Sequence, residues 1–227
     1  MEEATNVLFS IGPLEVTSTV TTMWAIVALL ALVSFLATRN LREEPGVLQT
    51  AAEMAVGALR NFFEGTLGRE HTRKYFPILG TFFVFIIVCN YSGLLPGAGH
   101  LSGFAVPTAC LSVTAGLGVI AFFTTHVIGI RERGLGRYLA SFAKPLILVV
   151  LMLPLNLLEQ FIRPMSLALR LYGNMYGEEN VTEQLYGIFP VLAPLIMQVL
   201  SLIFCLLQAV VFTMLLSIYI SEALEEE

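Results

Sequence analysis

Four long runs without a charged side chain dominate this sequence of 227 residues and restrict what it can fold into. They cover residues 20–37, 75–130, 145–158 and 184–221. A helix crosses the hydrocarbon layer of a membrane with about 20 apolar residues. Charged residues make up only 13% of the chain, against roughly 25% in soluble domains. The sequence therefore predicts an all-α polytopic membrane protein that forms one membrane domain, residues 1–227.

Two of the runs need interpretation before spans can be assigned. The run 75–130 is too long for one crossing, and the Pro- and Gly-rich stretch 95–107 in its middle predicts a turn between two helices. The run 184–221 is entered through Pro190 and Pro194 and predicts one long tilted helix. Five transmembrane helices result, and the last two form a long hairpin. The predicted spans are about 20–38, 75–95, 107–130, 145–177 and 190–221.

Between the first two spans, residues 47–64 have the pattern of an amphipathic helix that lies in the membrane interface. Gln49, Glu53 and Glu64 share one face, opposite Met54 and Phe62. We therefore expect one interfacial helix in addition to the five spans.

The distribution of Lys and Arg predicts the orientation of the chain. Residues 39–74 and 131–144 together contain ten basic residues, whereas residues 1–17, 96–106 and 178–183 contain none. Basic loops stay on the cytoplasmic side of a membrane. The N-terminus is therefore predicted to lie outside and the C-terminus inside.

A polar stripe in the fourth span is the most unusual feature of the sequence. Its members are three or four residues apart and so share one helix face: Glu159, Arg163, Ser166, Arg170, Asn174 and Glu178. An arginine at the membrane centre costs about 2.5–3.5 kcal/mol on insertion scales, so Arg170 must face a partner, water or another subunit. The alternative is that Arg170 only ties helices together through an ion pair with Glu159, Glu178 or Glu179, although within the helix Glu159 is too far away to pair with it directly. For Arg163, an ion pair with Glu159 four residues earlier is the favoured interpretation.

The last span carries a weaker polar stripe of Gln198, Ser201, Cys205 and Gln208. Such groups usually form hydrogen bonds between membrane helices. The three cysteines and three histidines make no metal-ligand pattern, and there is no glycine-rich phosphate loop for chemistry on ATP. We expect no cofactor, no metal and no nucleic-acid partner.

The stretch RPMSLALRLYGNMYGEE, residues 163–179, closely resembles the signature of the a subunit of F-type ATP synthases. The stretches PLNLLEQF, LLQAVVFTML and CNYSGLLPG add to the resemblance, which covers most of the chain. It implies a non-catalytic stator subunit that conducts protons or Na⁺ through two offset half-channels. The implied partners are a ring of c subunits, the b subunits of the peripheral stalk and the lipid bilayer.

The resemblance also implies a role for each polar residue. Arg170 would face the c-ring and favour the ionised form of its carboxylate. Glu179, with Glu178 beside it, matches the acidic residue of the outer half-channel, and Glu159 matches the one near the inner half-channel. Asn174 and Gln208 match residues that line the arginine, and Gln208 is expected to hydrogen-bond or orient Arg170.

The sequence departs from the family pattern at Ser201. Some members have a His or Glu there, paired with the outer acidic site, whereas a serine hydroxyl does not titrate near neutral pH. Two alternatives to the stator remain open from the residues. One is a stand-alone cation transporter or channel, which would conduct ions without the ring. The other is a membrane enzyme with Glu159, Glu178 or a histidine as acid and base. A bacterial plasma membrane is the expected location, ahead of a thylakoid membrane.

Overall fold

The computed structural model describes residues 7–11, 14–39, 46–95, 105–141, 149–188 and 192–224. It is dominated by helices, as predicted, and four of them, α1, α2, α3 and α6, are long and apolar enough to cross a membrane. The helices are α1 Ser18–Arg39, α2 Val47–Ser92, the 3₁₀ helix η1 Pro107–Ala109, α3 Leu111–Arg133, α4 Leu135–Ser141, α5 Val149–Ile188 and α6 Leu192–Leu224. The chain is therefore a polytopic membrane protein.

A small antiparallel hairpin precedes the helices and was not predicted. Strands β1 (Val7–Ile11) and β2 (Leu14–Thr17) pair so that Ile11 lies opposite Leu14 and Ser10 opposite Glu15. β-Branched residues are frequent in this segment, which favours strands over helix. The prediction of an all-α chain was incomplete at this point.

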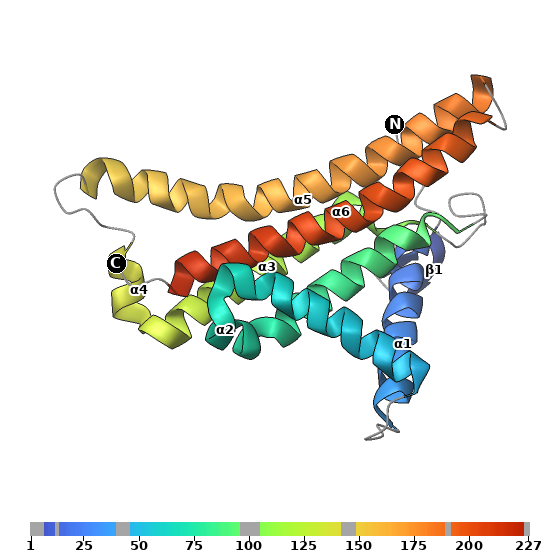
Figure 1. Cartoon of the computed structure of the whole chain (residues 1–227). Coiled ribbons are helices and arrows are strands. Elements are labelled where there is room, and N and C mark those ends of the chain that lie inside the picture. Colours follow the sequence, from blue (N-terminus) through green and yellow to red (C-terminus); the bar gives the residue numbers. More distant parts are fainter. Residues whose placement is uncertain are drawn as a thin grey trace.

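Helix α2 covers both the predicted interfacial helix 47–64 and the predicted span 75–95. Its two halves meet at a kink at Gly68, which has φ 72° and ψ 165°, and residues 65–74 are otherwise helical, so both halves extend beyond the predicted bounds. A positive φ is accessible to glycine without a steric penalty, and the two halves of α2 run in different directions (Figure 1). The first half packs through Phe63 and Leu67, whereas Met54 and Phe62 on the predicted apolar face stay exposed.

A shared hydrophobic core joins α2, α3, α5 and α6. Leu79 and Ile86 of α2, Leu171 of α5 and Leu216 of α6 have no exposed surface in this core. The rings of Phe82 in α2 and Phe212 in α6 stack with their centroids 5.9 Å apart. Helix α1 stands apart (Figure 1) and is buried only near its start, which leaves most of its apolar surface for lipid.

Helices α5 and α6 lie side by side as an antiparallel hairpin, as predicted (Figure 1). Helix α6 begins at Leu192, so Pro194 falls in its first turn, where a missing backbone N–H costs no hydrogen bond. Helix α5 continues beyond the predicted end at residue 177 to Ile188. The side chains of Asn180 and Thr182 donate hydrogen bonds to the carbonyl oxygens of Tyr176 and Glu178, which is compatible with helix. The expected outer loop 178–183 is therefore helical.

Helices α3 and α5 approach each other closely at Gly118. A Cβ atom on Gly118 would lie 2.8 Å from the carbonyl oxygen of Pro164 and 3.2 Å from the Cβ of Ala168. A hydrogen atom is therefore the largest side chain that fits between the two backbones.

Candidate functional site along the α5–α6 hairpin

Arg170 lies near the middle of α5, on a side of the helix that the rest of the chain leaves exposed. The neighbouring residues Leu167 and Leu171 point into the core, with exposed fractions of 2% and 0%. Within the described part of the chain, Arg170 forms no ion pair, whereas Arg163 pairs with both Glu159 and Glu222. A role for Arg170 as an intramolecular tie between helices therefore receives no support.

Asn174 and Gln208 connect α5 and α6 one turn from Arg170. The Nδ2 atom of Asn174 donates a hydrogen bond of 2.6 Å to Oε1 of Gln208. The sequence predicted that Gln208 would bind or orient Arg170, but its oxygen accepts from Asn174 instead. Gln208 is only 5% exposed, and its Nε2 has no hydrogen-bond partner among the described residues. The amide pair places a buried polar group beside the arginine.

Glu178 lies about two turns along α5 from Arg170, and it faces α6. Its carboxyl group lies near Ser201 of α6, and Ser201 is 3% exposed. Ser201 also donates a 2.8 Å hydrogen bond to the carbonyl oxygen of Met197. Glu179 is exposed on an adjacent part of the helix surface. The structure thus places Glu178 close to the position on α6 where the sequence departs from the family pattern.

Asn90 of α2 belongs to the same polar region, and the sequence reasoning missed it. It is fully buried, and its Nδ2 donates a 3.2 Å hydrogen bond to the carbonyl oxygen of Cys205. Its Oδ1 has no hydrogen-bond partner among the described residues. A single asparagine inside an otherwise apolar span is costly to bury, and this was the signal that could have revealed it.

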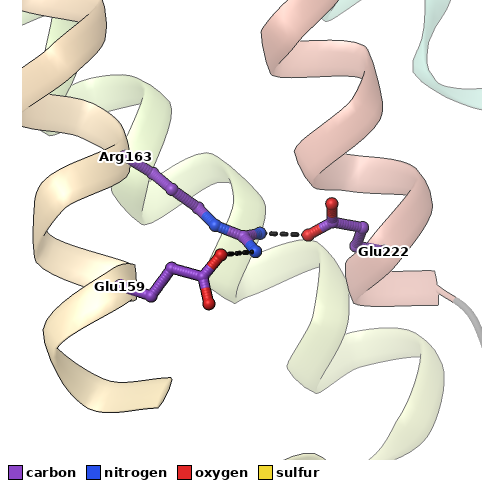
Figure 2. A network of polar contacts seen from close by, with 3 residues as sticks. All are labelled: Glu159, Arg163 and Glu222. Atoms are coloured by element: carbon purple, nitrogen blue, oxygen red, sulfur yellow. Dashed lines mark hydrogen bonds and ion pairs between the residues drawn. The ribbon is translucent and has the colours of Figure 1, made fainter. Parts of the chain in front are cut away.

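At the other end of the hairpin, Arg163 connects α5 to the C-terminal part of α6 (Figure 2). Its Nη2 lies 2.7 Å from Oε1 of Glu159, which confirms the predicted ion pair. Its Nη1 binds Oε2 of Glu222, and its guanidinium carbon lies 5.1 Å from the centre of the Tyr219 ring. Glu222 was not singled out in the sequence, although it is the first charged residue after the last uncharged run.

This cluster predicts a test of how the hairpin is held together. We expect Arg163→Glu to lower the free energy of unfolding by about 1–2 kcal/mol, because three carboxylates then meet at a partly exposed site. The double substitution Arg163→Glu with Glu222→Arg should recover most of this loss, as measured by thermal unfolding in detergent. Arg69→Glu is the control, since the Arg69 side chain is 89% exposed. Equal instability of the single and double variants would contradict an interhelical ion pair.

These features define a class of protein. Ionisable and amide side chains inside membrane helices are rare and mark ion pathways. Here they follow the facing sides of one long helix hairpin, from Glu159 to Glu178 on α5 and from Ser201 to Glu222 on α6. The fold and the site are those of an ion-translocating membrane protein.

Comparisons with known proteins identify the family. The model of the ATP synthase A chain family matches residues 20–221. The chain is 42% identical over 204 residues to ATP synthase subunit a 3 of Pelobacter propionicus, and the aligned region covers 89% of this chain and 86% of that protein. It is 41% identical to ATP synthase subunit a of Geotalea daltonii, with the same coverage. It is 38% identical to ATP synthase subunit a 2 of a Bradyrhizobium species over 96% of this chain and 93% of that protein.

The chain therefore belongs to the ATP synthase A chain family. It is a proton-conducting stator subunit of the membrane sector, and it is not itself a catalytic subunit. The recognition made from the residues 163–179 is confirmed.

Proposed function

We propose that Arg170 is the coupling residue of this stator and faces the ring of c subunits. One observation carries the proposal: Arg170 lies on an exposed side of α5, between two polar regions of the hairpin. By helix geometry, Arg163 and Glu178 lie about 10 and 12 Å from Arg170 along the axis. A charged group on that side requires a partner of opposite charge, and a ring carboxylate supplies one.

The two polar regions are proposed as the two half-channels. Protons enter from outside through Glu178, Glu179, Ser201 and Asn90, and bind the ring carboxylate. After the ring has turned, the carboxylate arrives at Arg170, whose positive charge favours its ionised form. The proton then leaves on the inner side, near Glu159. The same charge prevents protons from passing directly between the half-channels.

We also propose how the chain crosses the membrane. Five crossings with an interfacial helix, an outer N-terminus and an inner C-terminus place Glu178 outside and Arg163 inside. Four of the five are apolar by composition, and the fifth, α5, is the one with the polar stripe. Bacterial relatives favour the inner membrane of a bacterium. The c-ring and the b subunits of the peripheral stalk are the proposed partners within the complex.

Proton flux through the purified chain tests this function against a stand-alone channel. In liposomes with an imposed membrane potential, we expect no flux above background from the chain alone and rapid flux from the complete membrane sector. The physical reason is that neither half-channel crosses the membrane by itself. Flux from the chain alone, at a rate comparable with that of the complete sector, would establish the channel and refute the stator mechanism.

Exchanging each outer carboxylate tests the outer path. We expect Glu178→Gln and Glu179→Gln to slow ATP-driven proton pumping without uncoupling it, because an amide accepts no proton near neutral pH. The larger effect is expected at Glu178, which is the more buried of the two and lies near Ser201. Ser201→Ala should matter much less, since the hydroxyl does not titrate. Pumping at the wild-type rate in both glutamine variants would place proton entry elsewhere.

A further inference from the structure

A small cavity on the proposed inner side of the hairpin contains a histidine that the mechanism above does not use. The cavity lies between α3, α5 and α6, and its polar lining consists of Thr125, His126, Gln160, Arg163 and Tyr219. His126 comes from α3, a helix that contributes no residue to the stripes on α5 and α6. A titratable group is thus placed beside the hairpin at the end where Arg163 joins α5 to α6.

Among the described residues, the two carboxylates beside the cavity are already paired. Glu159 of α5 and Glu222 of α6 both bind Arg163, and arginine keeps its charge throughout the physiological range. The remaining ionisable neighbours are Tyr138 of α4 and Tyr219 of α6, and phenols ordinarily ionise near pH 10. Histidine is the side chain that changes charge between pH 5 and 8. Among the described residues that line the cavity, only His126 is of this kind.

The contacts of His126 determine which ring nitrogen exchanges a proton. Its Nδ1 lies 2.8 Å from the carbonyl oxygen of Phe122. A carbonyl oxygen only accepts hydrogen bonds, so Nδ1 carries a proton and donates it. The Nε2 atom is therefore the basic nitrogen of the neutral ring. The rings of Phe122 and Tyr138, with centroids 4.0 and 5.9 Å away, hold the imidazole in place.

The cavity lies near the coupling arginine along α5. Tyr219 lines the cavity, and its ring centre lies 5.1 Å from the guanidinium carbon of Arg163. Along α5, the step from Arg163 to Arg170 is about two helical turns, or roughly 10 Å. A proton path between the inner side and Arg170 along the hairpin would begin at the end where the cavity lies.

We propose that His126 is a proton-relay residue of the inner half-channel and exchanges protons at Nε2 within this cavity. The inference rests on the proposed function, because it needs a proton path on the inner side of Arg170. It assigns the acid–base role on that side to α3, while Glu159 serves mainly as a partner of Arg163.

The test is ATP-driven proton pumping by the intact complex in inverted membrane vesicles, whose medium is the inner side. The pumping rate of the complex with His126→Gln is divided by the pumping rate of the wild-type complex at each pH, so that the pH dependence of the catalytic head cancels. Protons are taken up from the medium in this direction, so the relay works while the histidine is protonated. We expect a ratio of about one tenth at pH 6 that rises towards one above pH 8. Loss of an acid–base group typically costs about 100-fold, and we expect less here because water also carries protons.

His71→Gln is the matched control, since it makes the same chemical change on α2, away from the cavity, and its ratio should stay near one. His126→Asn provides a second non-titrating variant whose amide can still donate to the Phe122 carbonyl, in case the glutamine variant does not assemble. A ratio that does not depend on pH in the assembled variants would overturn the relay. Arg170→Ala in the same vesicles separates the two proposals: if it pumps, the stator mechanism fails, whereas an inactive Arg170→Ala with a flat His126 profile refutes only the relay.

Discussion

Arg170→Ala is expected to abolish ATP-driven acidification of inverted vesicles while the complex still assembles. Without the guanidinium, nothing on this side of α5 favours the ionised ring carboxylate, and the ring loses the step that releases its proton. Arg170 makes no ion pair within the described part of the chain, and its neighbours Leu167 and Leu171 remain packed. The variant should therefore fold, and its loss should be functional.

Passive proton permeability of the same vesicles provides the second measurement. Removal of the positive charge between the half-channels should leave permeability unchanged or raise it, but should not lower it. The amount of the subunit in the purified complex is the control for assembly. Pumping that persists in an assembled Arg170→Ala complex would show that the arginine is structural, even though the family is established.

Gly118→Leu is expected to have the largest effect on folding. Even a Cβ atom at this position would lie 2.8 Å from the carbonyl oxygen of Pro164. Because this atom belongs to the backbone, α5 cannot yield by rotating a side chain. Overpacking of a core costs about 1–3 kcal/mol, and we expect a loss at or above the upper end, seen as a lower unfolding temperature in detergent and little assembled subunit.

Gly116→Leu is the matched control in the same helix. No atom lies within 4 Å of a Cβ at Gly116, and the residue is exposed. Leucine is a better helix former than glycine, so this variant should be at least as stable as wild type. An equal loss of stability in both variants would mean that any leucine in α3 is destabilising. The close approach of α3 to α5 at Gly118 would then not be the cause.

Local patterns predicted the helices well where hydrophobic runs and breakers agreed. The run 20–37 became α1, and Pro194 entered α6 in its first turn. The predicted division of residues 47–95 into two helices corresponds to a kink at Gly68, a glycine at positive φ with helix on both sides, but helix also fills most of the predicted connection 65–74. Nothing in the sequence around Gly68 distinguishes it from the other helical glycines. The extension of α5 to Ile188 was missed because its acidic outer end has the composition of a loop.

For the site, spacing along one helix was informative, whereas contacts between helices were not. The Arg163–Glu159 pair follows from residues four apart and is confirmed. Glu222 and Asn90 come from other helices, and the partner of Gln208 depends on the register between α5 and α6. Periodicity carries no information on that register. The roles of the predicted site residues stay predictions until the variants above are measured.

The exposed side of α5 has a consequence for how the complex is built. A chain inserted alone would present Arg170 to lipid at a cost of about 2.5–3.5 kcal/mol on insertion scales, with no carboxylate of its own to relieve it in the described part of the chain. Such an orphan subunit is less stable than one that meets its rotor. If the proposed ring supplies the opposite charge, joining the complex after the ring is present would shorten the time for which Arg170 faces lipid.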